Sequence, residues 1–484
     1  MKGISFVRQF GEIVLAISLA PLFSGWIAQC RAWLQNRSAP PLLLPYRTMR
    51  KLFHKNAALA ADASLLFRST PYVLFGTMVL AAAIIPSIAT DLPFARAADS
   101  IALIGLFATA RVFQSLAAMD IGTAFRTLGS RREMMIGFLA EPALLMVLFN
   151  AFLLFGSTSL PSLVDGSAAH SSVIDPKVIF AAVAFVMVLL AENGRIPIDN
   201  PTTHLELTMI HEALVLEYSA RHLALVEWAA SLKLFNYACI GFALFLPWGI
   251  ATRGADSGGA VIVSIVALIG KLLIAGAALA LGEALSAKLR IFRAPEYLAI
   301  FVPACRAGTA CSSPAGGLKH MQMPQMILGV LKLLASGLLL ISFSLLSQRR
   351  TQRLITLFAW QGTVLFVSTL LVAVSAGLKE LYYSAALILV LKVIALPAIL
   401  RYLIRRLGSV AEWDSKPLVS IPTTMLSGLA LVLFAFGLAQ PICRMATTIT
   451  RNTLRIALAV ILLSFLMMIT RRKAVTQVIG FLAM

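Results

Sequence analysis

The sequence predicts an all-α fold, a polytopic transmembrane helical bundle with about thirteen spans. Hydrophobic residues make up 59% of the 484-residue chain and charged residues only 13%, whereas an average soluble domain has roughly 25% charged residues. The apolar residues fall in long blocks such as "LFGTMVLAAAIIPSIA" and "IALAVILLSFLMMIT". A helix needs about 20 apolar residues to cross the hydrocarbon core, so these blocks indicate membrane spans.

The candidate spans form two sets. The first set lies at 8–29, 70–89, 100–119, 138–156, 176–191, 228–249, 260–285 and 294–311. The second set, of about five helices, lies at 324–346, 353–376, 381–403, 419–441 and 452–470. The last block of the first set, within "APEYLAIFVPACRAGTACSSPAGG", decays into small residues, so we expect a short or strained crossing there.

A stretch of Ser, Pro and Gly at 312–317 marks the best domain boundary, because these residues favour turns and loops. We therefore predict one membrane domain over 1–311, a linker over 312–323 and a second membrane segment over 324–484. No internal repeat is visible, which disfavours a transporter built from inverted repeats.

The chain has a formal net charge of +20, from 41 basic and 21 acidic residues. In a soluble protein this excess would suggest a nucleic-acid partner. Here the basic residues cluster in alternate loops, such as 126–132 and 288–293, and basic loops mark the cytoplasmic side of a membrane protein. We therefore predict a multi-pass protein of the cell inner (plasma) membrane with cytoplasmic basic loops, surrounded by membrane lipid and without nucleic acid.

The five cysteines are scattered along the chain, at Cys30, Cys239, Cys305, Cys311 and Cys443. None forms a CxxC pair, and no histidine accompanies them at zinc spacing. We therefore expect no metal site and no directly bound cofactor. No small-residue cleavage site follows the first apolar stretch, which we expect to remain as a helix.

The segment 192–227 is unusually acidic and contains half of the histidines. At a cytoplasmic membrane surface this composition suggests proton handling or docking to a basic partner. A helix beginning near Pro201 is predicted within 200–219. Plainer interpretations remain open: Thr203 and Glu206 have the spacing of a capping box, and acids on a solvated helix face are ordinary. The histidines lack the HExxH spacing of a zinc site.

Several charged residues fall inside the apolar blocks. An ionised side chain near the bilayer centre costs roughly 3 kcal/mol on insertion scales, and such residues by default mark an ion path. The alternative is snorkelling, in which a long side chain reaches the interface. Snorkelling fits Glu141, Lys271 and Glu283, which lie near block ends, but fits Arg111 and Lys392 poorly.

Four motifs now support a family resemblance. The run "AENGRIPIDNPTTHLELTMIHEALVLEYS" resembles the signature loop of hydrogenase-4 component C and formate hydrogenlyase subunit 4, relatives of the quinone-site membrane subunit of complex I. "LAAMDIGTAFRTLGSRREMMIGFLAEPALLM", "AKLRIFRAPEYLA" and "RAWLQNRSAPPLLLPYRTMRKLF" resemble other parts of the same family, and all four motifs lie within 5–304. The resemblance implies an eight-helix membrane anchor for a soluble hydrogenase module.

The resemblance also implies roles for individual residues. The candidates for a proton path are Glu141, Glu192, Glu206, Glu212 and Glu217. The candidates for shaping the cytoplasmic loops against a soluble partner are Arg111, Asp120, Arg132, Glu133, Arg195 and Asp199. A purely structural alternative is that Arg195 and Asp199 pair with each other.

The second half, 324–484, resembles hydrogenase-4 component E, which is related to a small membrane subunit of complex I. The runs "LKELYYSAALILVLKVIALPAILRYLIRR" and "RRKAVTQVIGFLAM" carry this resemblance. In that family the final stretch leads into an acidic residue associated with proton transfer, whereas this chain stops at Met484. We therefore expect a C-terminally truncated segment, with Lys392 as its remaining candidate charge for the proton path.

Together these observations favour a non-catalytic membrane anchor and proton-coupling subunit of an energy-converting [NiFe] hydrogenase complex. Its expected partners are the hydrogenase large and small subunits, an iron–sulfur protein and antiporter-like membrane subunits. The [NiFe] centre and the iron–sulfur clusters would lie on those partners. Two alternatives remain: a membrane component of a complex I-like NADH:quinone oxidoreductase that forms a quinone site, and a structural or non-functional fusion scaffold.

Overall fold

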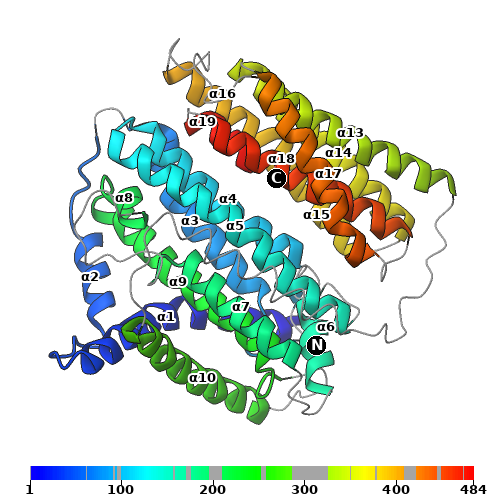
Figure 1. Ribbon diagram of the computed structural model, residues 1–484. Helices are drawn as coiled ribbons and strands as arrows, with labels where there is room; N and C mark the ends of the chain where they lie inside the picture. The colour runs from blue at the N-terminus through cyan, green and yellow to red at the C-terminus, as the bar shows by residue number, and fades with distance from the viewer. Residues whose placement is uncertain are drawn as a thin grey trace. The chain divides into compact units, whose positions relative to one another are not determined.

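The computed structural model describes residues 2–60, 63–90, 93–94, 100–155, 159–169, 176–195, 210–251, 258–285, 325–348, 350–376, 379–407, 421–443, 448–471 and 474–483. The chain forms two compact units, Met1–Ser312 and Ser313–Met484. Throughout the described ranges the regular structure is helical, apart from isolated bridge residues such as the pair Ala89 and Ala251. The prediction of an all-α helical bundle is confirmed (Figure 1).

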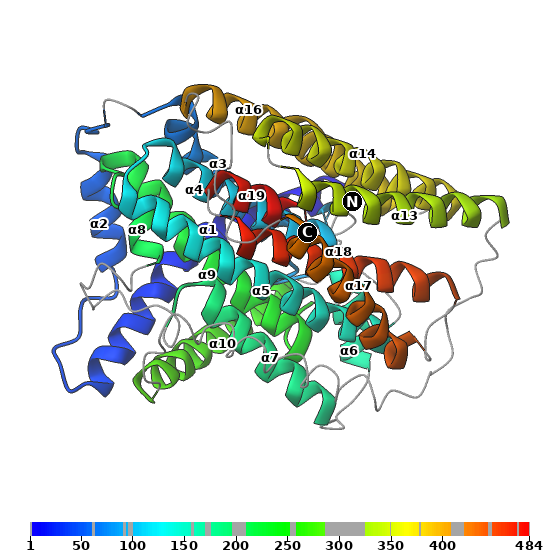
Figure 2. The ribbon, with the colours of Figure 1, turned by 45° about the horizontal axis from the view of Figure 1, so that its top comes forward.

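The helices of the first unit are α1 (Lys2–Leu34), α2 (Leu44–Phe53), α3 (Leu65–Ile84), α4 (Ser100–Asp120), α5 (Ala124–Phe155), α6 (Leu160–Ala169), α7 (Pro176–Glu192), α8 (His211–Val215), α9 (Ala220–Phe245) and α10 (Gly258–Leu285). Helix α3 packs against both α4 and α9, while α5 packs against α4 and α7 (Figures 1 and 2). Helix α1 packs against α9 and α10. The buried apolar core of the unit runs between these helices.

The helices of the second unit are α13 (Gln325–Ser347), α14 (Thr351–Ala376), α15 (Lys379–Ile388), α16 (Leu396–Leu407), α17 (Ile421–Cys443), α18 (Thr448–Thr470) and α19 (Ala474–Leu482). A π-helical stretch, Leu389–Ala395, joins α15 to α16 without a break. Helix α13 packs against α14, α17 and α18. Gly428 lies on α17 where an added Cβ would come within 3.0 Å of Leu346 and 3.1 Å of Leu463, so its small size permits this close packing.

Eight of the described helices are long and apolar enough to cross a membrane, judged by length and composition. They are Phe6–Leu34, Leu65–Ile84, Ala102–Asp120, Ala220–Phe245, Val261–Leu285, Gly329–Ser347, Thr351–Ser375 and Leu381–Arg405. Shorter apolar segments lie in α7, α17 and α18. The predicted spans at 138–156, 176–191, 419–441 and 452–470 coincide with α5, α7, α17 and α18. The predicted span at 294–311 and the linker at 312–323 lie outside the described residues.

Among the helices that begin earlier than their apolar blocks, α5 and α9 show the largest differences. Helix α5 begins at Ala124 rather than at 138, and α9 begins at Ala220 rather than at 228. Hydropathy identifies only the apolar part of a helix, which is stable in the hydrocarbon core. Both helices also include polar residues before this part, and several of these side chains are buried within the protein. Helix α9 thereby includes His222 and Glu227 from the predicted acidic loop.

The helix predicted within 200–219 differs from the observed structure more than α5 and α9 do. Residues 196–209 lie outside the described part of the chain, and α8 covers only His211–Val215. Helix α8 ends next to Leu214, whose carbonyl accepts a hydrogen bond from Arg126 Nη2 at 2.7 Å. The Tyr218 amide donates to the Val215 carbonyl, and Ala220 has a positive φ of 48°. These contacts accompany the end of α8, and α9 then begins after a turn.

Candidate functional site: a buried ionic cluster beside a cavity

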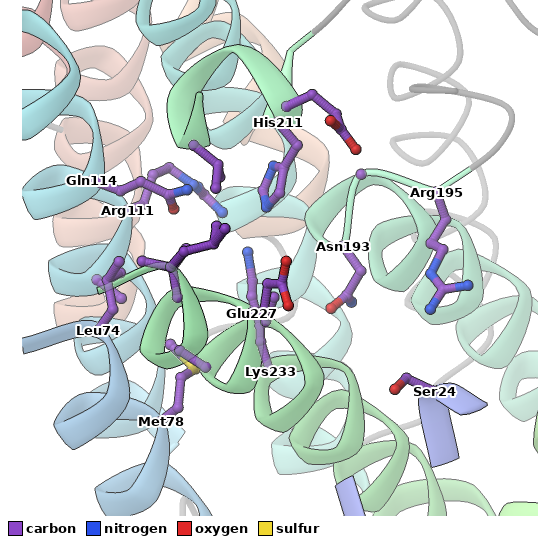
Figure 3. A pocket seen from close by; sticks show the side chains of 18 of the residues that line it. Ser24, Leu74, Met78, Arg111, Gln114, Asn193, Arg195, His211, Glu227 and Lys233 are labelled. Carbon is purple, nitrogen blue, oxygen red and sulfur yellow. The ribbon is translucent and has the colours of Figure 1, made fainter. Parts of the chain in front are cut away.

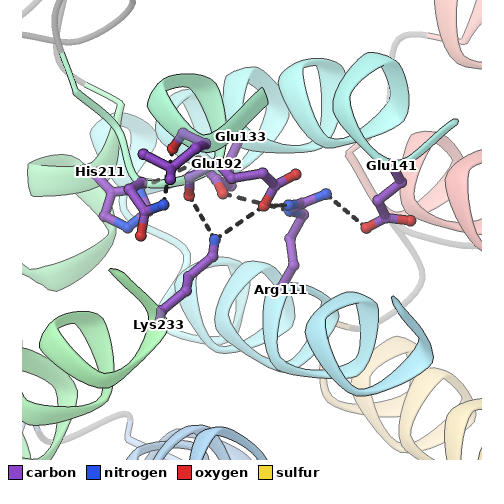
Figure 4. A network of polar contacts seen from close by, with 8 residues as sticks. Arg111, Glu133, Glu141, Glu192, His211 and Lys233 are labelled. Atoms are coloured by element: carbon purple, nitrogen blue, oxygen red, sulfur yellow. Dashed lines mark hydrogen bonds and ion pairs between the residues drawn. The ribbon is translucent and has the colours of Figure 1, made fainter. Parts of the chain in front are cut away.

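Arg111, in the middle of α4, is the centre of a buried cluster of charged side chains (Figure 4). The residue is only 3% exposed. Its guanidinium donates to Glu141 of α5 at 2.6 Å and to Glu192 at the end of α7. Its Nε lies 3.6 Å from a carboxylate oxygen of Glu133, also on α5. One arginine therefore contacts three buried carboxylates.

Two further side chains complete the cluster. Lys233 of α9 places its ammonium 3.1 Å from the Glu192 carboxylate and donates to the Glu192 backbone carbonyl at 2.6 Å. His211, the first residue of α8, places Nδ1 3.4 Å from a carboxylate oxygen of Glu133. The cluster thus joins α4, α5, α7, α8 and α9, and it holds three carboxylates, two cations and one histidine.

The local sequence of α5 explains part of this geometry. Glu133, Gly137 and Glu141 are spaced four residues apart, so they lie along one face of the helix. Arg111 lies directly over Gly137, where an added Cβ would collide with the guanidinium. The glycine therefore leaves the space that Arg111 needs between the two glutamates.

A cavity of about 620 Å³ lies beside the cluster (Figure 3). Its polar lining includes Arg111, His211 and Lys233, while its apolar lining includes Leu74 and Phe107. A pocket of this size with a few polar groups on an otherwise apolar wall has the character of a site for a small organic molecule.

A second ion-paired group lines the same cavity. Glu283, near the end of α10, accepts a hydrogen bond from Arg195 at 2.8 Å and lies 3.6 Å from Arg31 of α1. The alternative that Arg195 pairs with Asp199 concerns a residue outside the described ranges. The observed partner of Arg195 is Glu283, which ties the end of α7 to α10.

A cation–aromatic contact holds the chain that follows α8 in place. Phe67 and Tyr218 stack with ring centroids 4.2 Å apart, and the Arg126 guanidinium lies 5.0 Å and 5.4 Å from these two rings. Burial raises the pKa of the Tyr218 phenol, so the hydroxyl keeps its proton and donates to the Phe67 carbonyl at 3.4 Å. This contact fixes the α8–α9 turn, and with it the short helix that His211 begins.

The other predicted path residues are less closely associated with the cluster. Glu212 is exposed and lines the cavity, and Glu217 is half-buried just after α8. Lys392 lies in the π-helical stretch of the second unit, 5.9 Å from the centre of the Phe358 ring. Glu206 falls outside the described residues.

The predicted loop-shaping residues that the structure describes are buried or half-buried. Arg111 and Glu133 lie in the buried cluster rather than in a loop. Asp120 accepts a hydrogen bond from the Ser64 amide at 3.1 Å, at the start of α3. Arg132 is half-buried on α5, and Asp199 is not among the described residues.

The snorkelling interpretation is wrong for the three residues it seemed to fit. Glu141 and Glu283 are buried and ion-paired with arginines. Lys271 is also buried, and its ammonium donates to the Leu246 carbonyl at 2.6 Å. Protein groups, rather than the membrane interface, satisfy all three side chains.

A further buried carboxylate, which no pattern in the sequence marked, lies against the residues that follow the C-terminal end of α3. Glu12 of α1 is 2% exposed. One of its oxygens accepts three hydrogen bonds, from the Ser87 amide at 2.8 Å, the Ser87 hydroxyl at 2.5 Å and the Ile88 amide at 2.9 Å. Nothing in the local sequence marks this role, because the donors lie far along the chain. By contrast, the four-residue spacing of Glu133, Gly137 and Glu141 was a visible signal for the cluster.

The fold and the buried charges define a multi-pass membrane protein with a polar interior. The chain belongs to the NADH dehydrogenase family, whose sequence model matches residues 10–308. That match covers most of the first unit and all described members of the cluster.

Individual relatives identify a narrower group of similar proteins than the family does. Formate hydrogenlyase subunit 4 of Escherichia coli (strain K12) is 31% identical over 285 residues, which is 59% of this chain and 91% of the relative. Hydrogenase-4 component C of the same organism is 33% identical over 249 residues, 51% of this chain and 78% of the relative. An uncharacterised protein of Mycobacterium tuberculosis (strain ATCC 25618 / H37Rv) is 32% identical over 150 residues, 31% of this chain and 67% of the relative.

A solved structure shares the fold. It belongs to the membrane-bound sulfane sulfur reductase, an archaeal respiratory membrane complex, and the match covers 64% of this chain and 99% of that chain. The TM-score is 0.55 and the sequence identity is 21%. The predicted resemblance of the first half to formate hydrogenlyase subunit 4 and hydrogenase-4 component C is thus confirmed by the relatives themselves.

Proposed function

We propose that this protein is the membrane anchor and proton-coupling subunit of an energy-converting [NiFe] hydrogenase complex of the formate hydrogenlyase or hydrogenase-4 type. It would link a soluble redox module to ion translocation. The observation that carries the proposal is the Arg111 cluster: three carboxylates around one arginine, beside a cavity and inside a membrane protein. Ionisable residues in such an interior are costly and typically mark ion paths.

The cluster supports coupling because its ion pairs compete with one another. Arg111 contacts Glu133, Glu141 and Glu192 at the same time. A proton that neutralises one carboxylate weakens that contact, so Arg111 is drawn toward the two carboxylates that stay ionised, because coulombic interactions are strong in a low-dielectric interior. A change of charge in the cavity would in this way alter how strongly Arg111 is attracted to the glutamates of α5 and to Glu192 of α7.

Partner subunits would supply the redox chemistry. The partners we propose are the hydrogenase large and small subunits, an iron–sulfur protein and antiporter-like membrane subunits. The [NiFe] centre and iron–sulfur clusters would lie on them. Within the described ranges, no group of three or more His, Cys, Asp or Glu side chains is arranged to hold a metal ion.

The second unit would extend the membrane domain as a segment similar to hydrogenase-4 component E. Lys392 is its candidate proton-path residue, because it is a lysine within an apolar span and lies in a π-helical stretch. π-Helical turns occur frequently at functional sites. We place the whole chain in the cell inner membrane with its basic loops in the cytoplasm, on the basis of the alternating loop charge.

The cavity also favours a second candidate function, quinone binding in a complex I-like enzyme. Its volume of about 620 Å³ and its apolar wall of Leu74, Met78 and Phe107 suit an aromatic ring with an apolar tail. Inhibition of the intact complex by quinone-site inhibitors would favour this function. Insensitivity, together with hydrogen evolution, would favour the hydrogenase type.

The main test replaces Glu141 and Glu192 by Gln, separately, in the full complex. We expect proton movement per redox turnover to fall by at least about tenfold while the complex still assembles, because Gln keeps the shape but cannot ionise. Purification in mild detergent with mass spectrometry of co-purifying subunits measures assembly. Unchanged proton movement in both variants would refute the coupling role, and recovery of the chain without a redox partner would refute the anchor role.

A further inference from the structure

The buried cluster does not balance its charge with permanent ions. Glu133, Glu141 and Glu192 would contribute three negative charges when ionised, whereas Arg111 and Lys233 contribute two positive charges. The described side chains of the cluster therefore carry a formal charge of −1 when His211 is neutral. An uncompensated charge in a protein interior is strongly unfavourable, and one further proton would neutralise these described side chains.

His211 is placed to deliver that proton to the cluster. Its Nδ1 faces Glu133 at 3.4 Å, and its side chain also lines the cavity. Figure 3 shows the ring directed into the space bordered by Asn193 and Lys233. The only other described histidine of the 192–227 segment, His222, is buried beside Tyr72 and does not line the cavity.

Gly194 fixes the position of the His211 ring. Its φ of +56° is one that side-chain-bearing residues rarely adopt, and an added Cβ would lie 3.3 Å from His211 Cγ. Gly194 follows Glu192 closely in the chain, so the turn that ends α7 carries one cluster carboxylate and also packs against the histidine. The ring is therefore held between the cavity and the cluster.

We propose that His211 is the proton relay between the cavity and the Arg111 cluster. This inference rests on the proposed coupling function and identifies the residue that first takes up the proton. His211 accepts a proton at Nε2 from a hydronium ion in the cavity, which leaves neutral water, and it releases the proton on Nδ1 to Glu133. The imidazole is neutral before and after the transfer, while Glu133 changes from carboxylate to carboxylic acid. Arg111 then loses one of its three charged partners, so the net attraction on its guanidinium shifts toward Glu141 and Glu192.

Other charged groups share this environment. The ionisable groups that share the cluster or the cavity lining with His211 are Glu133, Glu141, Arg111, Glu192, Lys233, Glu212, Glu227, Arg195, Glu283, Arg31 and Tyr218. Glu212 and Glu227 are exposed, whereas Glu133 and Glu192 are buried. His211 is the histidine among them, and it contacts the buried carboxylate of Glu133.

The test compares His211→Ala with His222→Ala in membranes that contain the whole complex, with proton movement per redox turnover as the readout. We expect His211→Ala to lower this ratio by about tenfold and His222→Ala to leave it unchanged. Added imidazole can enter the space left by the missing side chain, so it should restore the ratio in His211→Ala only. A merely structural histidine would not be rescued in this way.

Glu192→Gln, measured alongside, separates the two proposals. A normal ratio in His211→Ala together with a low ratio in Glu192→Gln would overturn the relay and leave the coupling function standing. Normal ratios in both variants would overturn the coupling function itself. A low ratio in His211→Ala that imidazole fails to raise would also overturn the relay.

Discussion

Glu12 and Glu192 are both buried carboxylates of the same helical bundle, but different kinds of partner stabilise them. Glu12 accepts hydrogen bonds from two backbone amides and one hydroxyl. Glu192 contacts the charged side chains of Arg111 and Lys233. Backbone amides cannot change their charge or exchange partners, whereas ion pairs that share an arginine can. We therefore expect Glu192, and not Glu12, to take part in the proposed coupling.

Removal of Arg111 should have the largest effect, because this residue is the shared partner of Glu192 and the other cluster carboxylates. Arg111→Leu leaves three carboxylates without their shared cation, and breaking a buried ion pair costs about 3–5 kcal/mol. We expect the complex to fail to assemble or to unfold at a markedly lower temperature. Thermal unfolding of the detergent-solubilised complex measures the effect. Wild-type stability would show that the carboxylates do not depend on Arg111.

The matched substitutions Glu12→Gln and Glu192→Gln would sharpen the comparison. Glu12→Gln should destabilise the protein by about 1–2 kcal/mol, because it places an amide NH2 group where the second, buried oxygen of Glu12 has no hydrogen-bond partner. It should leave proton movement per turnover unchanged, unlike Glu192→Gln. Thermal unfolding and proton-movement assays on both variants provide the check. Loss of coupling in Glu12→Gln would remove the distinction between the two sites.

Tyr218→Phe should have the smallest effect. It removes one hydroxyl that donates to the Phe67 carbonyl at 3.4 Å, while the stacked ring and its contact with Arg126 remain. We expect a loss of about 0.5–1 kcal/mol of stability and a nearly normal coupling ratio. A large loss of coupling would instead mean that the phenol itself takes part in proton transfer.

The sequence predicted the fold class because hydropathy depends only on composition along the chain. Long apolar blocks require helices in a membrane, where every backbone group must be satisfied within its own segment. The same criterion placed the starts of α5 and α9 too late, since 124–137 and 220–227 contain several charged residues. The burial of such residues depends on contacts with other parts of the chain, such as that of Arg126 with Phe67 and Tyr218.

The sequence by itself determined that this protein spans a membrane, that it resembles a particular family, and that Arg111 needs a partner inside the bundle. Only the tertiary structure decided which residues those partners are. It joined Arg111 to Glu133, Glu141 and Glu192, and it placed His211 between the cavity and Glu133. The reason is physical: α4 has no acid near its centre to neutralise Arg111, and the carboxylates that do so come from helices elsewhere in the chain.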